Sequence, residues 1–380
     1  MSMIDERYAA QSRRGRAADA PGQIPQPGWK DIGWRLFQSI GRDRVLFTSA
    51  AVSFYILLAL VPTLNAFVSI YGLFNDATSV LDHVDLLAGV VPPGALGVVR
   101  DQLTRLAEQS RGGLGLSLLF SIGVALWGSS AGVKAMFEAM NIAYHEQENR
   151  SFIAFNGLAL LFALAGAIAA LLVIAVLLVV PSLVAFTPWS EGMGWTARLA
   201  AYAAMVLVLW VGVAALYRWG PSREQAKWRW ITPGSVFSAL LLSGGSVVFS
   251  WYVSNFSDDS AAYGSLGAVI GLMIWLWIST TIVILGAELN SEVEHQTARD
   301  STTGPAEPLG ERGARMADTV GRVWPPDREA VEIPEPRDRR KVTPLAIGIL
   351  LPTVLVALLK ARGKSETSPP PADPKGFTRS

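Results

Sequence analysis

Residues 157–186 read GLALLFALAGAIAALLVIAVLLVVPSLVAF, thirty positions without a single charged side chain. A transmembrane helix needs about 20 consecutive, mostly apolar residues. Because lipid offers no hydrogen-bond partner, every backbone N–H and C=O must be paired within the segment, so the run is predicted to be helical despite its glycines and β-branched residues. This stretch by itself indicates a membrane protein.

The composition of the whole chain agrees with that class. Of the 380 residues, 51% are hydrophobic and 17% are charged, against about 25% charged in soluble domains, and the mean hydropathy is +0.34. The absence of cysteine excludes disulfides, Cys-ligated zinc and iron–sulfur clusters, and three scattered histidines argue against a His-rich metal centre. A net charge of +1 gives no overall basic surface for nucleic acid. We expect neither a cofactor nor a bound metal.

Five further apolar runs accompany this one. The six spans are predicted at 45–74, 114–135, 157–186, 195–217, 232–253 and 266–288. The sequence therefore predicts an all-α fold, a polytopic membrane helical bundle with six core transmembrane helices, over residues 45–290. A seventh hydrophobic segment, 343–359, contains Pro344 and Pro352, and either spans the membrane or forms a re-entrant or surface-lying segment.

Lysine and arginine resist translocation across a membrane, so their distribution predicts the orientation of the chain. Eight of them lie in residues 1–44, four in 218–231 and nine in 291–341, and none lies in 187–194 or 254–265. The sequence therefore predicts a cytoplasmic N-terminus, with residues 291–341 in the cytoplasm as well.

The segments outside the spans are predicted to be small. Residues 29–44 carry apolar side chains at helical spacing, with Lys30 and Arg35 off the apolar stripe, which indicates an amphipathic helix in the membrane interface or an extension of the first span. Residues 291–341 contain six prolines and are predicted to be a cytoplasmic linker with one short surface helix. The other predicted segments are a disordered cytoplasmic N-terminus, 1–28, an outer cap, 75–113, and a disordered tail, 360–380.

Basic and aromatic residues alternate in the connection between the fourth and fifth spans. Tryptophan prefers the membrane–water interface and arginine pairs with phosphate groups, so the pattern indicates either simple anchoring or recognition of an anionic lipid headgroup or solute. Glu288 and Asn290 are expected to orient this basic rim, and Glu288 is expected to reach water at the end of its span. The candidate residues are Arg150, Arg218, Arg223, Lys227, Arg229, Trp230, Glu288 and Asn290.

Prolines that interrupt a helix and glycines that allow close packing mark candidate hinges. A proline removes a backbone donor, as in the broken helices that form transporter binding sites, although neighbouring helices can also satisfy such a kink. Glycines at a span end allow close helix packing or line a lipid groove. The candidate hinge and packing residues are Pro62, Asn65, Gly264, Gly267 and Gly271. Ionisable residues inside the spans are few, so proton-coupled transport is disfavoured.

Several short motifs carry a resemblance to a known family. They are Ser53-Phe54-Tyr55 with Pro62, Trp127 with Gly132, Ala139-Met140-Asn141-Ile142-Ala143-Tyr144, Pro233-Gly234, Tyr252-Val253-Ser254-Asn255-Phe256, Tyr263-Gly264-Ser265-Leu266-Gly267-Ala268 and Leu285-Gly286-Ala287-Glu288-Leu289-Asn290. Over about residues 29–295 the chain resembles the YihY/virulence factor BrkB family of inner-membrane proteins, once misassigned as ribonuclease BN. Ala262 departs from the Thr that many members have there, and segment 343–359 lies outside the family core.

The resemblance implies a six-helix fold in the bacterial inner membrane and a role in envelope physiology or transport, without an established substrate. The old nuclease name lacks support from the residues. Metal-dependent RNA hydrolysis needs clustered histidines and carboxylates, whereas His83, His145 and His295 fall in different connections. We therefore expect no catalytic residue and no enzyme activity, and no nucleic acid as a partner.

Two hypotheses from different classes follow. One is a transporter or lipid-handling protein, in which the basic rim gathers an anionic ligand. The other is a membrane scaffold or assembly factor that transports nothing. The expected partners are membrane lipids, with a second copy of the chain or other envelope proteins as further candidates.

Overall fold

The computed structural model describes residues 12–74, 114–185, 190–256 and 265–324. Within these ranges the chain is helical, and Ala226 and Thr302 form an isolated β-bridge rather than a strand. The long helices are α2 (Gln26–Arg42), α3 (Val45–Phe74), α6 (Leu114–Ala143), α7 (Phe152–Ala185), α8 (Ser190–Trp219), α9 (Trp228–Phe256) and α10 (Ser265–Glu294). The short elements are the 3-10 turns η1 (Ser12–Arg14) and η2 (Pro21–Gln23) and the single-turn helix α11 (Arg315–Asp318).

The predicted all-helical membrane class is confirmed. Each predicted span falls on one helix, and α6, α9 and α10 extend several residues past the predicted ends. Among the described residues, four helices contain a stretch long and apolar enough to cross a membrane, and α3 contains a shorter apolar stretch. The four stretches are Phe152–Ala170, Leu199–Trp219, Trp228–Tyr252 and Val269–Glu294. The predicted segments 75–113, 343–359 and 360–380 lie outside the described residues.

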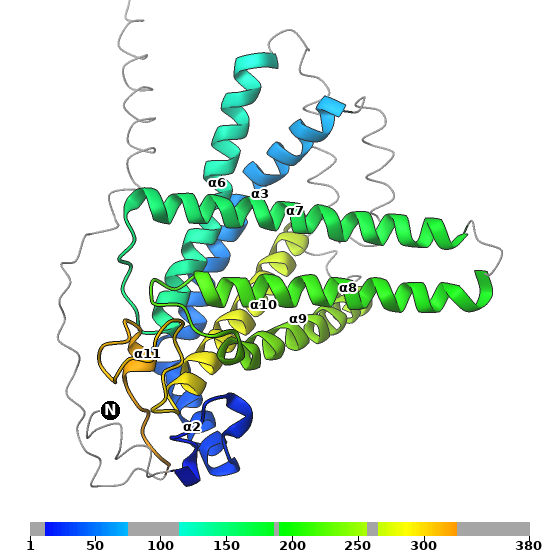
Figure 1. The fold of residues 1–380 in the computed structure, drawn as a ribbon. Coiled ribbons are helices and arrows are strands. Elements are labelled where there is room, and N and C mark those ends of the chain that lie inside the picture. Colours follow the sequence, from blue (N-terminus) through cyan, green and yellow to red (C-terminus); the bar gives the residue numbers. More distant parts are fainter. Residues whose placement is uncertain (1–11, 75–113, 186–189, 257–264, 325–380) are drawn as a thin grey trace, which may run out of the picture. The chain divides into compact units, whose positions relative to one another are not determined.

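The helices from α3 to α10 pack in a cycle (Figure 1). Each helix lies against the next one along the chain, and α10 returns to lie against α3. Polar contacts support this return. The hydroxyl of Ser53 donates to that of Thr280 at 3.2 Å, and the indole N–H of Trp277 donates to the carbonyl of Leu46 at 3.0 Å.

A buried core joins α8, α9 and α10. The hydroxyl of Tyr217 donates to the carbonyl of Val283 at 2.7 Å and lies 2.7 Å from the hydroxyl oxygen of Ser238. Beside this contact α9 and α10 approach closely at Gly234 and Gly286. A Cβ atom at Gly234 would overlap the carbonyl oxygen of Gly286, and one at Gly286 would overlap the Ser238 hydroxyl. Only glycine therefore allows the two backbones to meet here.

Terminal segments and connections gather at one end of the long helices, and we call them together the polar cap. The polar cap comprises residues 12–44, 144–151, 220–227 and 295–324. Backbone hydrogen bonds join its segments: the N–H of Ala298 donates to the carbonyl of Arg16, and that of Lys227 to the carbonyl of Ser301, each at 2.8 Å.

Residues 12–28 are ordered, whereas the sequence predicts disorder throughout 1–28. They form η1, η2 and the start of α2, and the side chains of Ala18 and Ile24 are buried together with Trp230. Local composition predicts disorder because this segment has little apolar surface of its own. Order comes instead from contact with a distant part of the chain.

Residues 295–324 also pack, although the sequence predicts a Pro-rich linker over 291–341. The predicted short surface helix corresponds to α11, but its Met316 is buried. Arg312 holds the surrounding loops together, because its guanidinium donates to the carbonyls of Ala317 at 2.7 Å and of Ala298 at 2.8 Å. Here a buried guanidinium satisfies backbone carbonyls that regular secondary structure would otherwise satisfy.

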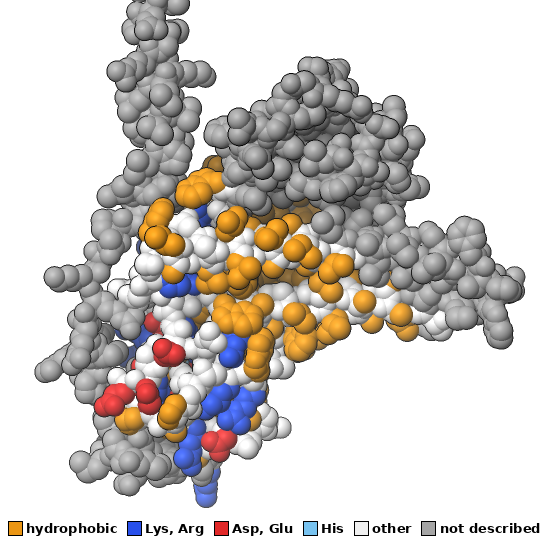
Figure 2. All heavy atoms as spheres, turned by 45° about the horizontal axis from the view of Figure 1, so that its top comes forward, with side chains coloured by type: hydrophobic (Ala, Val, Ile, Leu, Met, Phe, Trp, Pro, Cys, Tyr) orange, Lys and Arg blue, Asp and Glu red, His pale blue; other side chains and the backbone are white. Residues whose placement is uncertain are grey.

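Apolar side chains cover the long helices, and charged side chains gather at the polar cap (Figure 2). Large exposed hydrophobic residues include Leu164 and Leu172 on α7, Leu207 on α8 and Val247 on α9. In water such a surface would be an aggregation hazard, whereas in a bilayer it faces lipid. The distribution agrees with a membrane-embedded set of helices.

The predicted hinge residues do not form a visible break. α3 runs as one helix past Pro62 and Asn65. Gly267 lies inside α10, and a Cβ atom at Gly271 would meet no atom of a described residue within 4 Å. Gly264 lies outside the described residues.

Candidate functional site: the buried polar end of α10

The last two turns of α10 carry polar side chains in a buried environment. Glu288, Asn290, Glu292 and Glu294 are each 0–1% exposed, because α2 packs against α10 and the polar cap closes over its end. Buried carboxylates are costly unless they are paired and hydrogen-bonded. The partners of each carboxylate therefore decide what this site can do.

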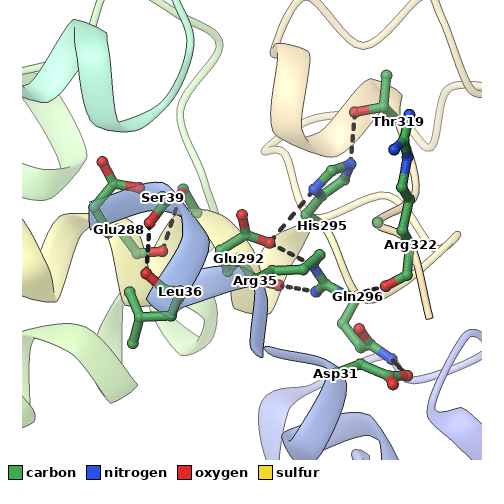
Figure 3. Close-up of polar contacts among 12 residues, drawn as sticks. Asp31, Arg35, Leu36, Ser39, Glu288, Glu292, His295, Gln296, Thr319 and Arg322 are labelled. Carbon is green, nitrogen blue, oxygen red and sulfur yellow. Dashed lines mark hydrogen bonds and ion pairs between the residues drawn. The ribbon is translucent and has the colours of Figure 1, made fainter. Parts of the chain in front are cut away.

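Arg35 of α2 pairs with Glu292 (Figure 3). Its Nε donates to Oε2 of Glu292 at 2.5 Å, and its other nitrogens donate to the carbonyls of Arg322 at 2.9 Å and of Glu292 itself at 3.0 Å. The sequence places Arg35 off the apolar stripe of an interfacial helix, yet Arg35 is buried and Phe37 is 76% exposed. The pairing turns the polar side of α2 toward α10.

His295 extends this pair toward α11. Its Nδ1 lies 3.6 Å from Oε2 of Glu292, and its Nε2 lies 3.0 Å from the hydroxyl oxygen of Thr319. Burial lowers the pKa of His295 because desolvation disfavours the imidazolium, and Arg35 acts in the same direction, although Glu292 opposes them. The imidazole therefore lies between Glu292 and Thr319 in surroundings that favour its neutral form.

A second polar cluster lies where α2 meets α3. Oδ2 of Asp43 accepts a hydrogen bond from Arg42 at 3.1 Å and lies 3.3 Å from Nε2 of His145, which follows α6. Burial raises the pKa of Asp43, but the contacts with His145 and Arg42 outweigh it and hold the pKa below its usual value. Arg42 also lies 3.8 Å from Glu292, so it connects the two clusters.

Arg150, a predicted rim residue, is occupied inside the protein. Its guanidinium donates to the two oxygens of Glu148 at 2.8 and 2.6 Å, and to the carbonyls of Trp219 and Gly220 at 3.1 and 2.8 Å. Burial raises the pKa of Glu148, but the pairing with Arg150 outweighs it and lowers the pKa. The contact fastens the end of α8 to the connection that follows α6.

Arg223 and Lys227 are also bound within the chain. Arg223 donates to Oε2 of Glu294 at 2.7 Å, and Nζ of Lys227 donates to the carbonyl of Asp300 at 2.9 Å. The acidic partners of the rim are therefore Glu148 and Glu294, whereas the sequence predicts Glu288.

Asn290 supports a helix and does not orient the rim. Its side-chain amide accepts from the N–H of Gly234 at 2.6 Å and donates to the carbonyl of Ile231 at 2.9 Å. These backbone groups lie on either side of Pro233, which has no N–H to donate. Asn290 therefore stabilises the first turns of α9 at the point where proline weakens them.

Arg229 is exposed, whereas Arg218 is partly exposed and its guanidinium also donates to the carbonyl of Ala226. The guanidinium carbon of Arg218 lies 4.7 Å from the centre of the Trp228 ring and 5.8 Å from that of Trp219. Both indoles are exposed, and Arg229 is exposed without an ion pair to any described residue. Trp230, in contrast, is completely buried. The predicted rim thus divides into an internal part and an exposed part.

The sequence predicts that Glu288 reaches water at the end of its span, and this prediction is wrong. Glu288 is 0% exposed, and neither of its carboxylate oxygens accepts a hydrogen bond from a described residue. Ser39 of α2 lies beside it (Figure 3).

Sequence reasoning missed Arg35, Asp43, Glu292 and His295 as site residues. One signal was present, because Glu288, Glu292 and His295 recur at four- and three-residue intervals, which places them on one face of a continuing helix. Their partners on α2 gave no such signal, since Arg35 precedes Glu292 by 257 positions.

No group of three or more His, Cys, Asp or Glu side chains among the described residues is arranged to hold a metal ion.

The family model described as virulence factor BrkB matches residues 36–310. The chain belongs to this family. The match spans α3 to α10 and reaches into the polar cap, so it includes the buried end of α10. The resemblance seen in the sequence is confirmed.

Relatives of this BrkB-family chain include two that are named membrane proteins. The protein named "Putative ribonuclease-like protein YfkH" of Bacillus subtilis is 32% identical over 249 residues, which cover 64% of this chain and 88% of the relative. A UPF0761 membrane protein of Alkalilimnicola ehrlichii is 27% identical over 292 residues, covering 76% of this chain and 63% of that protein. A UPF0761 membrane protein of Pseudoalteromonas translucida is 23% identical over 287 residues, which cover 73% of this chain and 89% of that protein. No solved structure matches the chain. The chain is a multi-pass membrane protein.

Proposed function

We propose that this BrkB-family chain is a transporter or lipid-handling protein of the bacterial inner membrane, with six membrane-spanning helices and the polar cap in the cytoplasm. Helices α3, α7 and α9 begin at the polar cap and α6, α8 and α10 end there, which supports six crossings. The cytoplasmic side is supported by the eight basic residues in 1–44 and the nine in 291–341.

The observation that carries the lipid-handling proposal is a surface that we call the Arg–Trp edge. It is formed by the exposed Trp219, Trp228 and Arg229 and by the partly exposed Arg218, one guanidinium nitrogen of which donates to the carbonyl of Ala226. It lies where the apolar helices α8 and α9 meet the polar cap, at the level where lipid headgroups are expected. Tryptophan prefers this level, and arginine can bind a phosphate oxygen pair with two parallel N–H donors. Arg150 and Arg223 do not contribute, because their guanidinium groups are occupied inside the protein.

The test measures retention of phosphatidylglycerol, an anionic lipid, by the full-length protein. Native mass spectrometry of protein released from nanodiscs of phosphatidylglycerol and phosphatidylethanolamine counts the lipids retained. The double variant Arg218→Gln/Arg229→Gln is compared with Arg13→Gln, which removes an exposed arginine of η1. At about 1 kcal/mol per basic contact, we expect the double variant to bind phosphatidylglycerol at least about tenfold more weakly, and the control to bind it normally. Equal retention by the two proteins would remove the proposed lipid site.

A second assay addresses movement of lipid. Proteoliposomes carrying the full-length chain should move fluorescent phosphatidylglycerol between leaflets faster than protein-free vesicles, and the double variant should slow that movement. A rate equal to that of protein-free vesicles would contradict the lipid-handling proposal.

A scaffold or assembly factor is the second candidate, favoured by α7 and α8. Only 11% of the membrane stretch of each is buried within the chain. Such faces can pack against a second copy or other envelope proteins. Cross-linking in intact membranes that recovers one defined partner on α7 or α8, with lipid assays silent, would favour this candidate.

A further inference from the structure

Glu288 is a buried carboxyl group without a hydrogen-bond donor among the described residues. It is 0% exposed, and both of its oxygens are unpartnered. The Ser39 hydroxyl lies close enough to act on the carboxyl group (Figure 3), but its hydrogen-bond geometry is met by the carbonyl of Leu36, to which it donates at 3.0 Å. An ionised carboxylate held in this way is far costlier than the neutral acid, because it loses its hydration and gains no donor in return.

The charges on α10 itself do not compensate Glu288. Glu292 follows one turn later and adds negative charge, and its cation Arg35 is committed to it at 2.5 Å. Arg35 further donates to two carbonyls, so its donors are occupied. His295, on the same face, lies against Glu292 with Nδ1 3.6 Å from Oε2, and burial disfavours its charged form by lowering its pKa.

The charges that face Glu288 from α2 and its C-terminal end do not compensate it either. Asp43 adds a second negative charge. Arg42 at 3.1 Å and His145 at 3.3 Å contact the carboxylate of Asp43. Arg42 is the cation that acts on Glu288, and it is shared with Asp43 and with Glu292 at 3.8 Å. Two arginines therefore face three acids: Arg35 is committed to Glu292 and Arg42 is shared, which leaves Glu288 as the group that can be neutral.

We infer that Glu288 is a proton-binding site, which holds a proton while α2 is docked on α10 and releases it when α2 moves away. On release the O–H bond of the carboxyl breaks and the proton bonds to a water oxygen, leaving a hydrated carboxylate. The ligand is the proton itself, and the inference stands independently of the lipid-handling proposal. The few ionisable residues of the spans argue against proton-coupled chemistry, but the structure brings three acids together where α2 packs against α10.

Proton binding and docking are then linked. The ordinary pKa of a glutamate in water is about 4.3. Above that pH, Glu288 is ionised when α2 is undocked, whereas it stays protonated when α2 is docked. Each added pH unit therefore shifts the equilibrium about tenfold toward the undocked form, until the docked form also loses its proton.

Hydrogen–deuterium exchange of residues 26–42 in the full-length protein in nanodiscs tests this linkage. Protection factors, corrected for the intrinsic pH dependence of exchange, are measured from about pH 7 to 9, above the ordinary titration range of histidine. We expect protection of α2 in the native chain to fall by up to about tenfold per pH unit. Glu288→Gln, which mimics the protonated acid, should remove the dependence, and Glu311→Gln, at an exposed glutamate of the polar cap, should keep it.

Three results would overturn the inference. The first is protection of α2 that stays constant with pH in the native chain, a result that can be read without any variant. The second is a fall in protection with pH that is equally steep in Glu288→Gln. The third is an infrared spectrum that Glu288→Gln leaves unchanged. For the last measurement, the carbonyl stretch of a protonated carboxyl near neutral pH should be weaker in Glu288→Gln than in the native chain, and unchanged in Glu311→Gln.

Discussion

Arg35 of α2 and Glu292 of α10 stand 257 positions apart in the chain and form one buried ion pair, with Nε and Oε2 2.5 Å apart. Their side chains are 6% and 1% exposed. The pair docks a helix from the N-terminal part of the chain onto the end of the last long helix. Removal of one partner from a buried pair is more damaging than replacement of both, because an uncompensated charge is left behind.

Arg35→Met should therefore weaken the docking of α2 by about 3–5 kcal/mol, measured as the opening free energy of residues 26–42 from hydrogen exchange. Lys30→Met, on the exposed side of the same helix, should change it by less than about 0.5 kcal/mol. Adding Glu292→Leu to Arg35→Met should recover much of the loss. Strictly additive losses would show that the two side chains act separately.

Gly234→Ala should destabilise the contact between α9 and α10. The added Cβ atom would overlap the carbonyl of Gly286 and lie 2.6 Å from the side-chain amide of Asn290. We expect a loss of about 1–3 kcal/mol in thermal unfolding of the purified protein. Gly244→Ala is the matched control in α9, because a Cβ atom there meets no atom within 4 Å in the part of the chain that the structure describes. Similar unfolding temperatures for the two variants would mean that the helices do not meet at Gly234.

Arg150→Lys should fail to preserve the polar cap although it keeps the charge. An ammonium cannot donate at once to both oxygens of Glu148 and to the carbonyls of Trp219 and Gly220, as the guanidinium does. The expected loss is about 1–3 kcal/mol, measured by thermal unfolding. Arg229→Lys, at an exposed arginine, should leave stability unchanged. A null result at both positions would argue that Arg150 only anchors the chain to headgroups.

Acid should loosen the polar cap in a step due to His295. Burial lowers the pKa of His295 in the folded protein, so its neutral form contributes stability above the unfolded value of about 6.5. That contribution is lost as the pH falls from 6.5 toward the folded pKa. Limited proteolysis of residues 295–324 should therefore accelerate below about pH 6.5, and His295→Gln should remove the step. Identical pH profiles for the two proteins would assign the step to another group.

The contribution of Asp43 to the stability of the polar cap should be lost at a lower pH than that of His295. The pKa of Asp43 is held below the usual value by His145 and Arg42, so its contribution is full above about pH 3.9 and is lost as the pH falls through the folded pKa. Asp43→Asn should remove this contribution at neutral pH, and should flatten the acid end of the proteolysis profile. A native profile without any change below pH 4 would contradict this assignment.

The long helices were predictable because their signal is local. A run such as 157–186 has no charge to place in lipid, so only a helix satisfies its backbone. The basic rim was predictable as a pattern, but its use was not. Arg150 and Arg223 were expected at a ligand-binding edge, and they bind Glu148 and Glu294 inside the polar cap instead.

The sequence by itself determined that this chain is a helical membrane protein of the BrkB family, because apolar length and short motifs act within single segments. Only the tertiary structure decided which side of α2 faces the protein, that residues 12–28 are ordered, and that Glu288 is sealed from water. Each of these depends on partners far away in the chain, and desolvation changes the energy of a charge only after those partners have assembled around it.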